Sequence, residues 1–522
     1  MDYRHKIAQL FSPAAFIHDS EENIQTIENL IRQEKIGGIT FFHSRHSAAA
    51  NFEKRQETLS YENSLEKLLQ LTNRYQNAAE TPLLISIDAE FGLAMRVEQT
   101  PQYPNAISLG AMEIGKVTLV EELGYRIGRD LRQCGIHVNF APVADINTNP
   151  KNPVIGYRSF GTDSEKVSRF ALAYYRGLKR AGVAGSYKHF PGHGDTDVDS
   201  HLGLPLIQKS REALMEEELY PFVQGIQAGI EMVMVGHLAA PSLTNGKNIP
   251  ASLSKEIIHD FLKNELGFHG IVVSDALNMK AISNLYPVPG ELEWRAFEAG
   301  NDLLCFSEHV QEGIKWIAAN ADPQAVEESF RKILGLKRKL GVFGSPPPTI
   351  AKFDWEGHSA FLASLAPKFL SVLADKGNTL SGKMAKISLH SPGPNRFFET
   401  LDLADPSPNY SLEDPFDPVW DQVEAFDWVL VSLFVPSAKP VNDFGLDMAM
   451  IEKLSHLAAK KRCVLYLFGN PLALSRLPDY YFFQKIVCAF QHFPECQETA
   501  AQHFLGQIRA EGTWEGGALT QA

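Results

Sequence analysis

The stretch TLVEELGYRIGRDLRQCGIHVNFAP, residues 118–142, joins a helical pattern to a strand pattern within one short segment. Leucine or isoleucine recurs every four residues from Leu119 to Leu131, which places one apolar face on a helix over Thr118–Gln133. The apolar run His137–Pro142 that follows has the length and composition of a buried strand. A helix that leads directly into a buried strand is typical of an α/β protein with a parallel sheet.

The same alternation continues on both sides of this segment. Further helices are expected over Glu165–Arg180, Arg211–Ala228 and Lys255–Leu266. The expected strands are the short apolar runs Ile7–Phe11, Gly38–Phe42, Leu83–Asp88, His137–Pro142, Gly185–Phe190, Met232–His237, Ile271–Asp275 and Asp302–Phe306. Eight strands that alternate with helices predict a (β/α)8 TIM barrel over residues 1–343.

A proline-rich break ends the barrel pattern at Gly344–Pro348. Three consecutive prolines there exclude a helix, so residues 344–365 are expected to form an extended linker. Beyond it, residues 366–522 are expected to form a smaller α/β sandwich domain. Its expected strands are Lys386–Leu389, Trp428–Phe434, Cys463–Phe468 and Lys485–Phe490, and its expected helices are Met448–Ala459 and Glu498–Ala510.

The composition is that of a soluble globular protein and excludes several classes of partner. Apolar residues make up 44% and charged residues 21% of the 522 residues. No apolar run reaches the roughly 18 residues that a membrane-spanning helix needs. The formal net charge is −13 without a long Lys/Arg cluster, so nucleic acid is not an expected partner. Met1–Phe16 lacks a signal-peptide core and the five cysteines form no CxxC pair, so we expect a cytoplasmic protein with buried free thiols.

Ionisable residues gather at the carboxyl ends of the expected barrel strands, which is where the active sites of α/β barrels lie. These residues are Asp88, Asp145, Lys188, His189, His237 and Asp275. Such side chains are poor core residues at the ends of apolar runs, but they make good convergent site residues. The sequence therefore predicts a functional site at this end of the barrel.

The loop KHFPGHGDTDVDSH, residues 188–201, holds three histidines, three aspartates and a lysine. Its composition fits a metal site, an acid/base loop for sugar chemistry, or a solvated polar loop without a role. One proline and two glycines make the segment a long turn rather than a helix that presents metal ligands. Asp199 lies two residues before His201, so its carboxylate can orient the imidazole and raise its basicity.

The pattern KHFPGHG…DSH resembles the signature of the β-N-acetylglucosaminidase branch of glycoside hydrolase family 3. Further segments resemble that family in the expected order: IDAEFG at 87–92 with Arg96 beyond it, NFAPVAD at 139–145 followed by IGYRSF at 155–160, and SDALNM at 274–279. The resemblance implies a (β/α)8 barrel followed by a C-terminal α/β sandwich. One departure is Phe91, which stands where the family has a glycine.

The resemblance implies a retaining exo-β-N-acetylglucosaminidase that hydrolyses terminal non-reducing N-acetyl-β-glucosaminides, in a small carbohydrate or muropeptide substrate from peptidoglycan. Asp275 would be the nucleophile that forms a covalent glycosyl-enzyme, and His201 would be the general acid/base with Asp199 as its partner. The resemblance implies no metal and no cofactor. The residues expected to hold the sugar hydroxyls are Asp88, Arg96, Arg158, Lys188 and His189.

Three alternatives remain open at the level of sequence. A β-glucosidase of the same family would share the nucleophile but take its acid/base from elsewhere. An N-acetylglucosamine phosphorylase would use phosphate in place of water, which a neutral histidine base does not repel. A non-enzymatic muropeptide-binding protein would share the pocket, but every expected catalytic position is filled in this chain.

Overall fold

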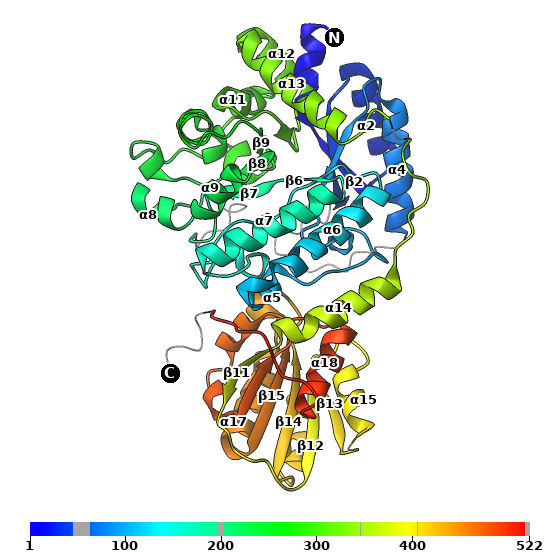
Figure 1. Ribbon diagram of the computed structural model, residues 1–522, viewed down its shortest axis with the longest axis vertical. Helices are drawn as coiled ribbons and strands as arrows, with labels where there is room; N and C mark the ends of the chain where they lie inside the picture. Colours follow the sequence, from blue (N-terminus) through cyan, green and yellow to red (C-terminus); the bar gives the residue numbers. More distant parts are fainter. Residues whose placement is uncertain (45–62, 197–202, 345, 405, 517–522) are drawn as a thin grey trace. The chain divides into compact units, whose positions relative to one another are not determined.

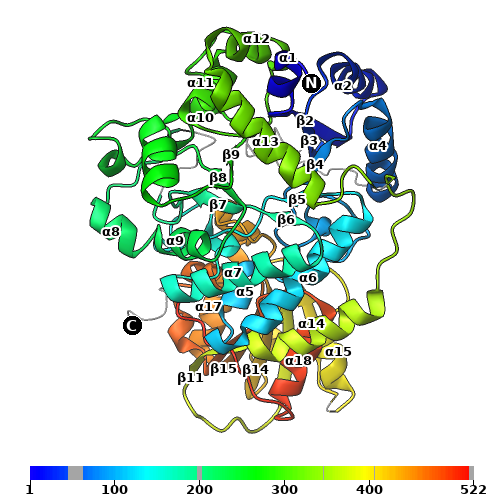
Figure 2. The same cartoon turned by 45° about the horizontal axis from the view of Figure 1, so that its top comes forward.

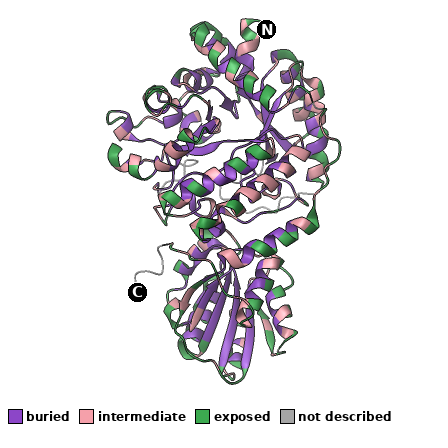
Figure 3. Cartoon of the chain, in the orientation of Figure 1, coloured by how far each residue is buried: buried purple, intermediate pink, exposed green. Residues whose placement is uncertain are grey.

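The computed structural model describes residues 1–44, 63–196, 203–344, 346–404 and 406–516 (Figure 1, Figure 2). The chain forms two compact units, and each combines helices with strands. The first unit contains Met1–Tyr103, Val117–Ile146 and Asp163–Phe353. The second unit contains Pro104–Lys116, Asn147–Thr162 and Asp354–Ala522. In both units the strands are mostly buried, and the helices have one buried and one exposed face (Figure 3).

The strands of the first unit are short and parallel. They are β1 (Phe11–Ser12), β2 (Ala14–His18), β3 (Gly38–Ser44), β4 (Leu84–Ile87), β5 (Val138–Asn139), β6 (Ala184–Gly185), β7 (Tyr187–Phe190), β8 (Met232–Val235), β9 (Ile271–Ser274) and β10 (Leu304–Cys305). One sheet has the order β2-β3-β4-β5-β6, a second has the order β7-β8-β9, and β1 pairs with β10. A parallel bridge between Val273 and Leu303 joins β9 to the start of β10. The carboxyl ends of neighbouring strands therefore lie along the same edge of each sheet.

Helices alternate with these strands along the chain. They are α1 (Tyr3–Ala8), α2 (Glu21–Glu34), α4 (Ser64–Ala78), α6 (Val117–Gln133), α7 (Ser164–Arg180), α8 (Arg211–Glu216), α9 (Tyr220–Gln227), a π-helix (Glu256–Glu265), α10 (Lys280–Ser283), α11 (Glu291–Ala299), α12 (Val310–Asn320) and α13 (Pro323–Lys339). Glycine allows α6 and α7 to pack in close contact. A Cβ on Gly177 would lie 2.1 Å from the carbonyl oxygen of Glu121, so alanine there would push the two helices apart.

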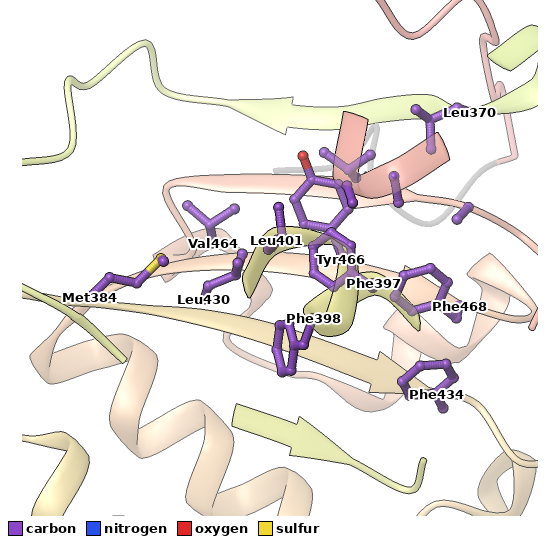
Figure 4. Packing of buried hydrophobic residues seen from close by; sticks show 14 of the residues in the cluster. Leu370, Met384, Phe397, Phe398, Leu401, Leu430, Phe434, Val464, Tyr466 and Phe468 are labelled. Atoms are coloured by element: carbon purple, nitrogen blue, oxygen red, sulfur yellow. The ribbon is translucent and has the colours of Figure 1, made fainter. Parts of the chain in front are cut away.

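The second unit is built on a six-stranded sheet of the order β11-β16-β15-β14-β12-β13, in which β11 alone is antiparallel. Its strands are β11 (Ser371–Asp375), β12 (Met384–Leu389), β13 (Asn409–Leu412), β14 (Trp428–Phe434), β15 (Arg462–Phe468) and β16 (Lys485–Cys488). Its helices are α5 (Ala106–Gly110), α14 (Trp355–Phe369), α15 (Arg396–Asp402), α16 (Val419–Val423), α17 (Met448–Lys460) and α18 (Pro494–Phe504). Aromatic side chains fill the core between α15 and the sheet, where the rings of Phe397 and Tyr466 lie 4.7 Å apart (Figure 4).

The predicted alternation of helices and strands is confirmed along most of the first unit, with two corrections. The expected strand Ile7–Phe11 is wrong, because Ile7 and Ala8 end helix α1 and the strands β1 and β2 follow it. Asp2 caps this helix by accepting the His5 N–H, which extends helical structure into the apolar run. The expected helix Arg211–Ala228 is two helices, because Glu217 leaves the helical region (φ −113°, ψ −93°).

The boundaries expected for the domains and the linker also differ from the structure. Residues 355–365 of the expected linker belong to helix α14, whose cap Asp354 accepts the Gly357 N–H at 2.9 Å. Residues 104–116 and 147–162, expected in the barrel, belong to the second unit. Gln491, for example, donates to the Ser108 hydroxyl at 2.6 Å in a buried hydrogen bond. Among the described residues, no helix has both the length and the apolar character that crossing a membrane requires.

Candidate active site

The ionisable residues singled out at strand ends lie in the first unit at the positions that the sequence predicts. Asp88 follows β4, Lys188 and His189 belong to β7, and Asp275 follows β9. Two other expected residues, Asp199 and His201, lie outside the described residues. Their roles stay predictions from the sequence.

Lys188 lies between two carboxylates that follow β4. Its ammonium is 2.7 Å from an oxygen of Asp88 and 2.7 Å from an oxygen of Glu90, and its side chain is only 2% exposed. The turn that carries both carboxylates is held by Asn139 on β5, whose side-chain amide accepts the Ala89 N–H and donates to the Ala89 carbonyl, both at 3.0 Å. A buried charge requires such pairing, so this arrangement keeps Lys188 charged and fixed in position.

His189 is fixed by Asp145, a fully buried carboxylate that comes after β5. Asp145 accepts the His189 backbone N–H, the His189 ring Nδ1 at 2.7 Å and the His193 backbone N–H at 2.8 Å. Burial opposes the ionisation of Asp145, but the facing histidines and these bonds outweigh it and lower its pKa. The bond to Nδ1 fixes the orientation and the tautomer of the His189 ring, which directs Nε2 away from Asp145.

The described part of the 188–201 loop is also tied down further along the chain. The Thr196 hydroxyl lies 2.7 Å from Nδ1 of His193, and burial lowers the pKa of His193 to about 4, so this histidine is neutral at pH 7. Asp195 faces the ammonium of Lys209 at 3.5 Å, and Lys209 also binds the buried Glu218 at 2.5 Å. Hydrogen bonds and ion pairs therefore hold the described part of this loop, residues 188–196.

Asp275 has the properties of an ionised nucleophile. Its side chain is partly exposed, and one carboxylate oxygen accepts the Ala276 N–H at 2.8 Å. Desolvation by the surrounding protein raises its pKa, but electrostatic interactions with His237, His189 and Lys188 and the hydrogen bond from the Ala276 N–H outweigh desolvation and lower the pKa to about 2. The carboxylate is therefore negatively charged throughout the physiological pH range.

His237 supports the backbone next to Asp275. Its Nε2 donates to the Ala276 carbonyl at 2.8 Å, and its Nδ1 lies 2.7 Å from the Ser252 hydroxyl. Burial lowers the pKa of His237, so its ring is neutral at pH 7, with Nδ1 accepting from Ser252. The sequence placed His237 at a strand end, and its two bonds within the protein indicate a structural role beside the nucleophile.

The two expected arginines are held in different surroundings. Arg96 follows a short 3-10 turn, Leu93–Met95, and its guanidinium stacks on the Phe42 ring at 4.1 Å from the ring centre. Arg158 ends a similar turn in the second unit and donates to the Val154 carbonyl at 3.2 Å. The role of Arg158 toward a sugar stays a prediction. Phe91, the departure from the family pattern, is buried.

Asp145 and Glu90 are residues of the site for which the sequence predicted no contact with the sugar. Asp145 was noted at a strand end, but its three bonds depend on His189 and His193, which lie 44 and 48 residues away in sequence. Within the described parts of the chain, no group of three histidine, cysteine or carboxylate side chains could hold a metal ion. All five cysteines are buried and free.

Comparison with known proteins places this chain in a family. Residues 3–336 match the glycosyl hydrolase family 3 N-terminal domain. The chain belongs to glycosyl hydrolase family 3. A solved relative within family 3, a β-N-acetylglucosaminidase from Paenibacillus sp. str. FPU-7, has a TM-score of 0.81 and 27% identity, with 100% of both chains covered.

Two sequence relatives of this family 3 chain are β-hexosaminidases. Beta-hexosaminidase A of Pseudoalteromonas piscicida is 36% identical over 291 residues, which cover 53% of this chain and 46% of that protein. Beta-hexosaminidase of Stenotrophomonas maltophilia is 31% identical over 291 residues, which cover 54% of this chain and 80% of that protein. The match therefore spans about half the length of the Pseudoalteromonas relative.

Proposed function

We propose that this family 3 chain is a retaining exo-β-N-acetylglucosaminidase that acts on terminal non-reducing N-acetyl-β-glucosaminides. The observation that carries the proposal is the partly exposed carboxylate of Asp275 directly after β9, which accepts the Ala276 N–H at 2.8 Å and whose pKa is lowered by its surroundings, His237 first among them. The β-N-acetylglucosaminidase and β-hexosaminidase names of the relatives support the choice of sugar. Muropeptides from peptidoglycan are the natural substrate that we propose.

The proposed reaction has two steps. Asp275 attacks the anomeric carbon, and the bond between that carbon and the leaving oxygen breaks while His201 gives its proton to that oxygen. Water then attacks the anomeric carbon of the glycosyl-enzyme, the bond to Asp275 breaks, and His201 takes a proton from the water. Two inversions leave the configuration of the sugar unchanged. Asp199 is proposed to orient His201 and stabilise its protonated form.

The remaining residues are proposed to bind the sugar rather than react with it. Lys188 and Arg96 supply donors to hydroxyl groups, and the Asp88 carboxylate accepts from them. The ring of His189, held by Asp145, adds a further contact. Such bonds can strengthen as positive charge develops on the sugar in the transition state, which would raise kcat as well as lower KM.

We also propose that the parallel strands of the first unit close into a (β/α)8 barrel. The pairing of β1 with β10, the bridge from Val273 to Leu303, and the continuation of β6 into β7 across Ser186 support this closure. A closed barrel would bring the carboxyl ends of all its strands to one mouth, and Asp88, Lys188 and Asp275 would then share a pocket.

A panel of aryl β-glycosides, assayed with and without phosphate, tests the proposed function. We expect kcat/KM for the N-acetyl-β-glucosaminide to exceed that for the β-glucoside at least tenfold, and nuclear magnetic resonance to detect the β-anomer as the first product. Comparable values for the two sugars would contradict the N-acetylglucosaminidase assignment. Formation of a sugar 1-phosphate at a rate that rises with phosphate would instead identify a phosphorylase.

The Asp145→Asn substitution is expected to lower kcat/KM roughly 10- to 100-fold, because a charge-assisted bond to His189 is lost. The amide keeps the size of the carboxylate, but it places an NH₂ group against N–H donors whose hydrogen bonds Asp145 accepts in the wild type. The His189 ring therefore loses the partner that fixes its tautomer. Steady-state kinetics check this expectation. Asp322→Asn, at the cap of α13, serves as the control with unchanged kinetics, and a wild-type kcat/KM in Asp145→Asn would contradict the role given to Asp145.

A further inference from the structure

Glu90 has no role in the proposed reaction, yet it makes one of the most enclosed ion pairs of the site. Its side chain is 4% exposed, and its carboxylate oxygen lies 2.7 Å from the ammonium of Lys188. We propose that Glu90 is a positioning residue, which holds the Lys188 ammonium in the direction needed to bind a sugar hydroxyl. This inference rests on the proposed function.

The Lys188 ammonium lies between two carboxylates of one turn. Asp88 and Glu90 lie two residues apart on the turn after β4, and each places an oxygen 2.7 Å from Lys188. An ammonium directs three N–H groups at tetrahedral angles. The hydrogen bond to Asp88 and the ion pair with Glu90 restrict its rotation, so the protein limits the directions in which the ammonium can donate to a sugar. A lysine with a single partner could rotate about that one bond.

The two carboxylates differ in their exposure to solvent. The Asp88 side chain is 22% exposed, whereas the Glu90 side chain is 4% exposed. Asp88 is therefore the more accessible of the two carboxylates, whereas Glu90 is enclosed together with Lys188. Glu90 keeps Lys188 in place when substrate engages Asp88.

Buried side chains hold the backbone around Glu90. The Tyr174 hydroxyl donates to the Glu90 carbonyl at 3.0 Å, and Asn139 holds Ala89 through two bonds at 3.0 Å. Both anchoring side chains are buried, one on helix α7 and one on strand β5. The carboxylate of Glu90 is thus mounted on a fixed segment, which is what a positioning residue requires.

A double-mutant cycle separates a positioning role from a merely structural one. The variants are Glu90→Gln, Lys188→Met and the double variant, assayed on an aryl N-acetyl-β-glucosaminide, with folding followed by thermal unfolding. If Glu90 acts through Lys188, Glu90→Gln alone should lower kcat/KM roughly 10- to 100-fold, mostly through KM. In the Lys188→Met background the same substitution should change kcat/KM by less than about twofold, because residues that act as a unit are not additive.

Two further variants complete the experiment. Glu28→Gln removes another buried carboxylate that is paired with a cation, Arg74 at 2.8 Å, and should keep wild-type kinetics. Glu90→Asp keeps the charge but draws the carboxylate back by one methylene, so its kcat/KM should fall below that of the wild type. This variant tests the inference even if Glu90→Gln does not fold. Additive losses in the double variant, or wild-type kinetics in Glu90→Asp, would overturn the inference alone. A wild-type chain without glycosidase activity would overturn the inference and the proposed function together.

Discussion

Asp275→Ala is expected to lower kcat by roughly four orders of magnitude or more while the unfolding temperature stays near that of the wild type. Without the carboxylate no covalent glycosyl-enzyme can form, and the remaining groups can only bind the sugar. Asp275 accepts the N–H of its own neighbour Ala276 and lies at the end of a strand, so its loss removes little packing. Steady-state kinetics on an aryl N-acetyl-β-glucosaminide measure the effect.

Azide makes this prediction more specific. A small anion can enter the space that Asp275 leaves and attack the anomeric carbon from the same face, which should restore turnover and yield an α-glycosyl azide. Asp260→Ala, which removes an exposed carboxylate on the π-helix, is the matched control and should keep wild-type kinetics. More than a few per cent of wild-type kcat in Asp275→Ala without azide would show that another group is the nucleophile.

His201→Ala is expected to have the second largest effect, and its size should depend on the leaving group. General acid catalysis contributes on the order of 10²- to 10⁴-fold when the leaving oxygen must be protonated, as for a sugar, and much less for an activated phenol. The ratio of kcat/KM for the dinitrophenyl glycoside to that for a disaccharide should therefore rise in the variant. The alkaline limb of the pH profile should also disappear, because the group that loses its proton there is gone.

The control for this experiment is His259→Ala, which removes a half-exposed histidine on the π-helix. It should leave both substrates and the pH profile unchanged. Equal losses on the activated and the unactivated substrate in His201→Ala would argue that His201 binds or shapes the loop but does not transfer a proton. That outcome would leave the role of Asp275 intact.

Sequence periodicity predicted the order of helices and strands well because burial on one face leaves a regular spacing of apolar residues. The strands around Gly38, Leu84, Met232 and Ile271 were found in this way, and so was the placement of Asp275 after its strand. The error at Ile7 arose where a capped helix and a strand share one apolar run. Periodicity alone does not separate the two over so few residues.

The partners of the site residues could not be predicted, because they depend on contacts between distant segments. Lys188 meets Asp88 and Glu90 only when β7 and β4 belong to the same unit, and Asp145 meets His189 in the same way. The sequence showed which ionisable groups lie at strand ends but not which carboxylate would pair with which cation. The assignment of 147–162 to the second unit likewise has no signal in composition.

Trapping the glycosyl-enzyme with a 2-fluoro sugar that carries an activated leaving group tests the central claim most directly. Electron withdrawal by fluorine slows both steps, but the activated leaving group speeds the first step only. The second step is therefore the slower one, and a covalent intermediate should accumulate. Intact mass should rise by one sugar residue, and peptide mapping should place the label on Asp275 in the segment SDALNM. A label on another carboxylate, or turnover without any covalent species and with inverted configuration, would contradict the account.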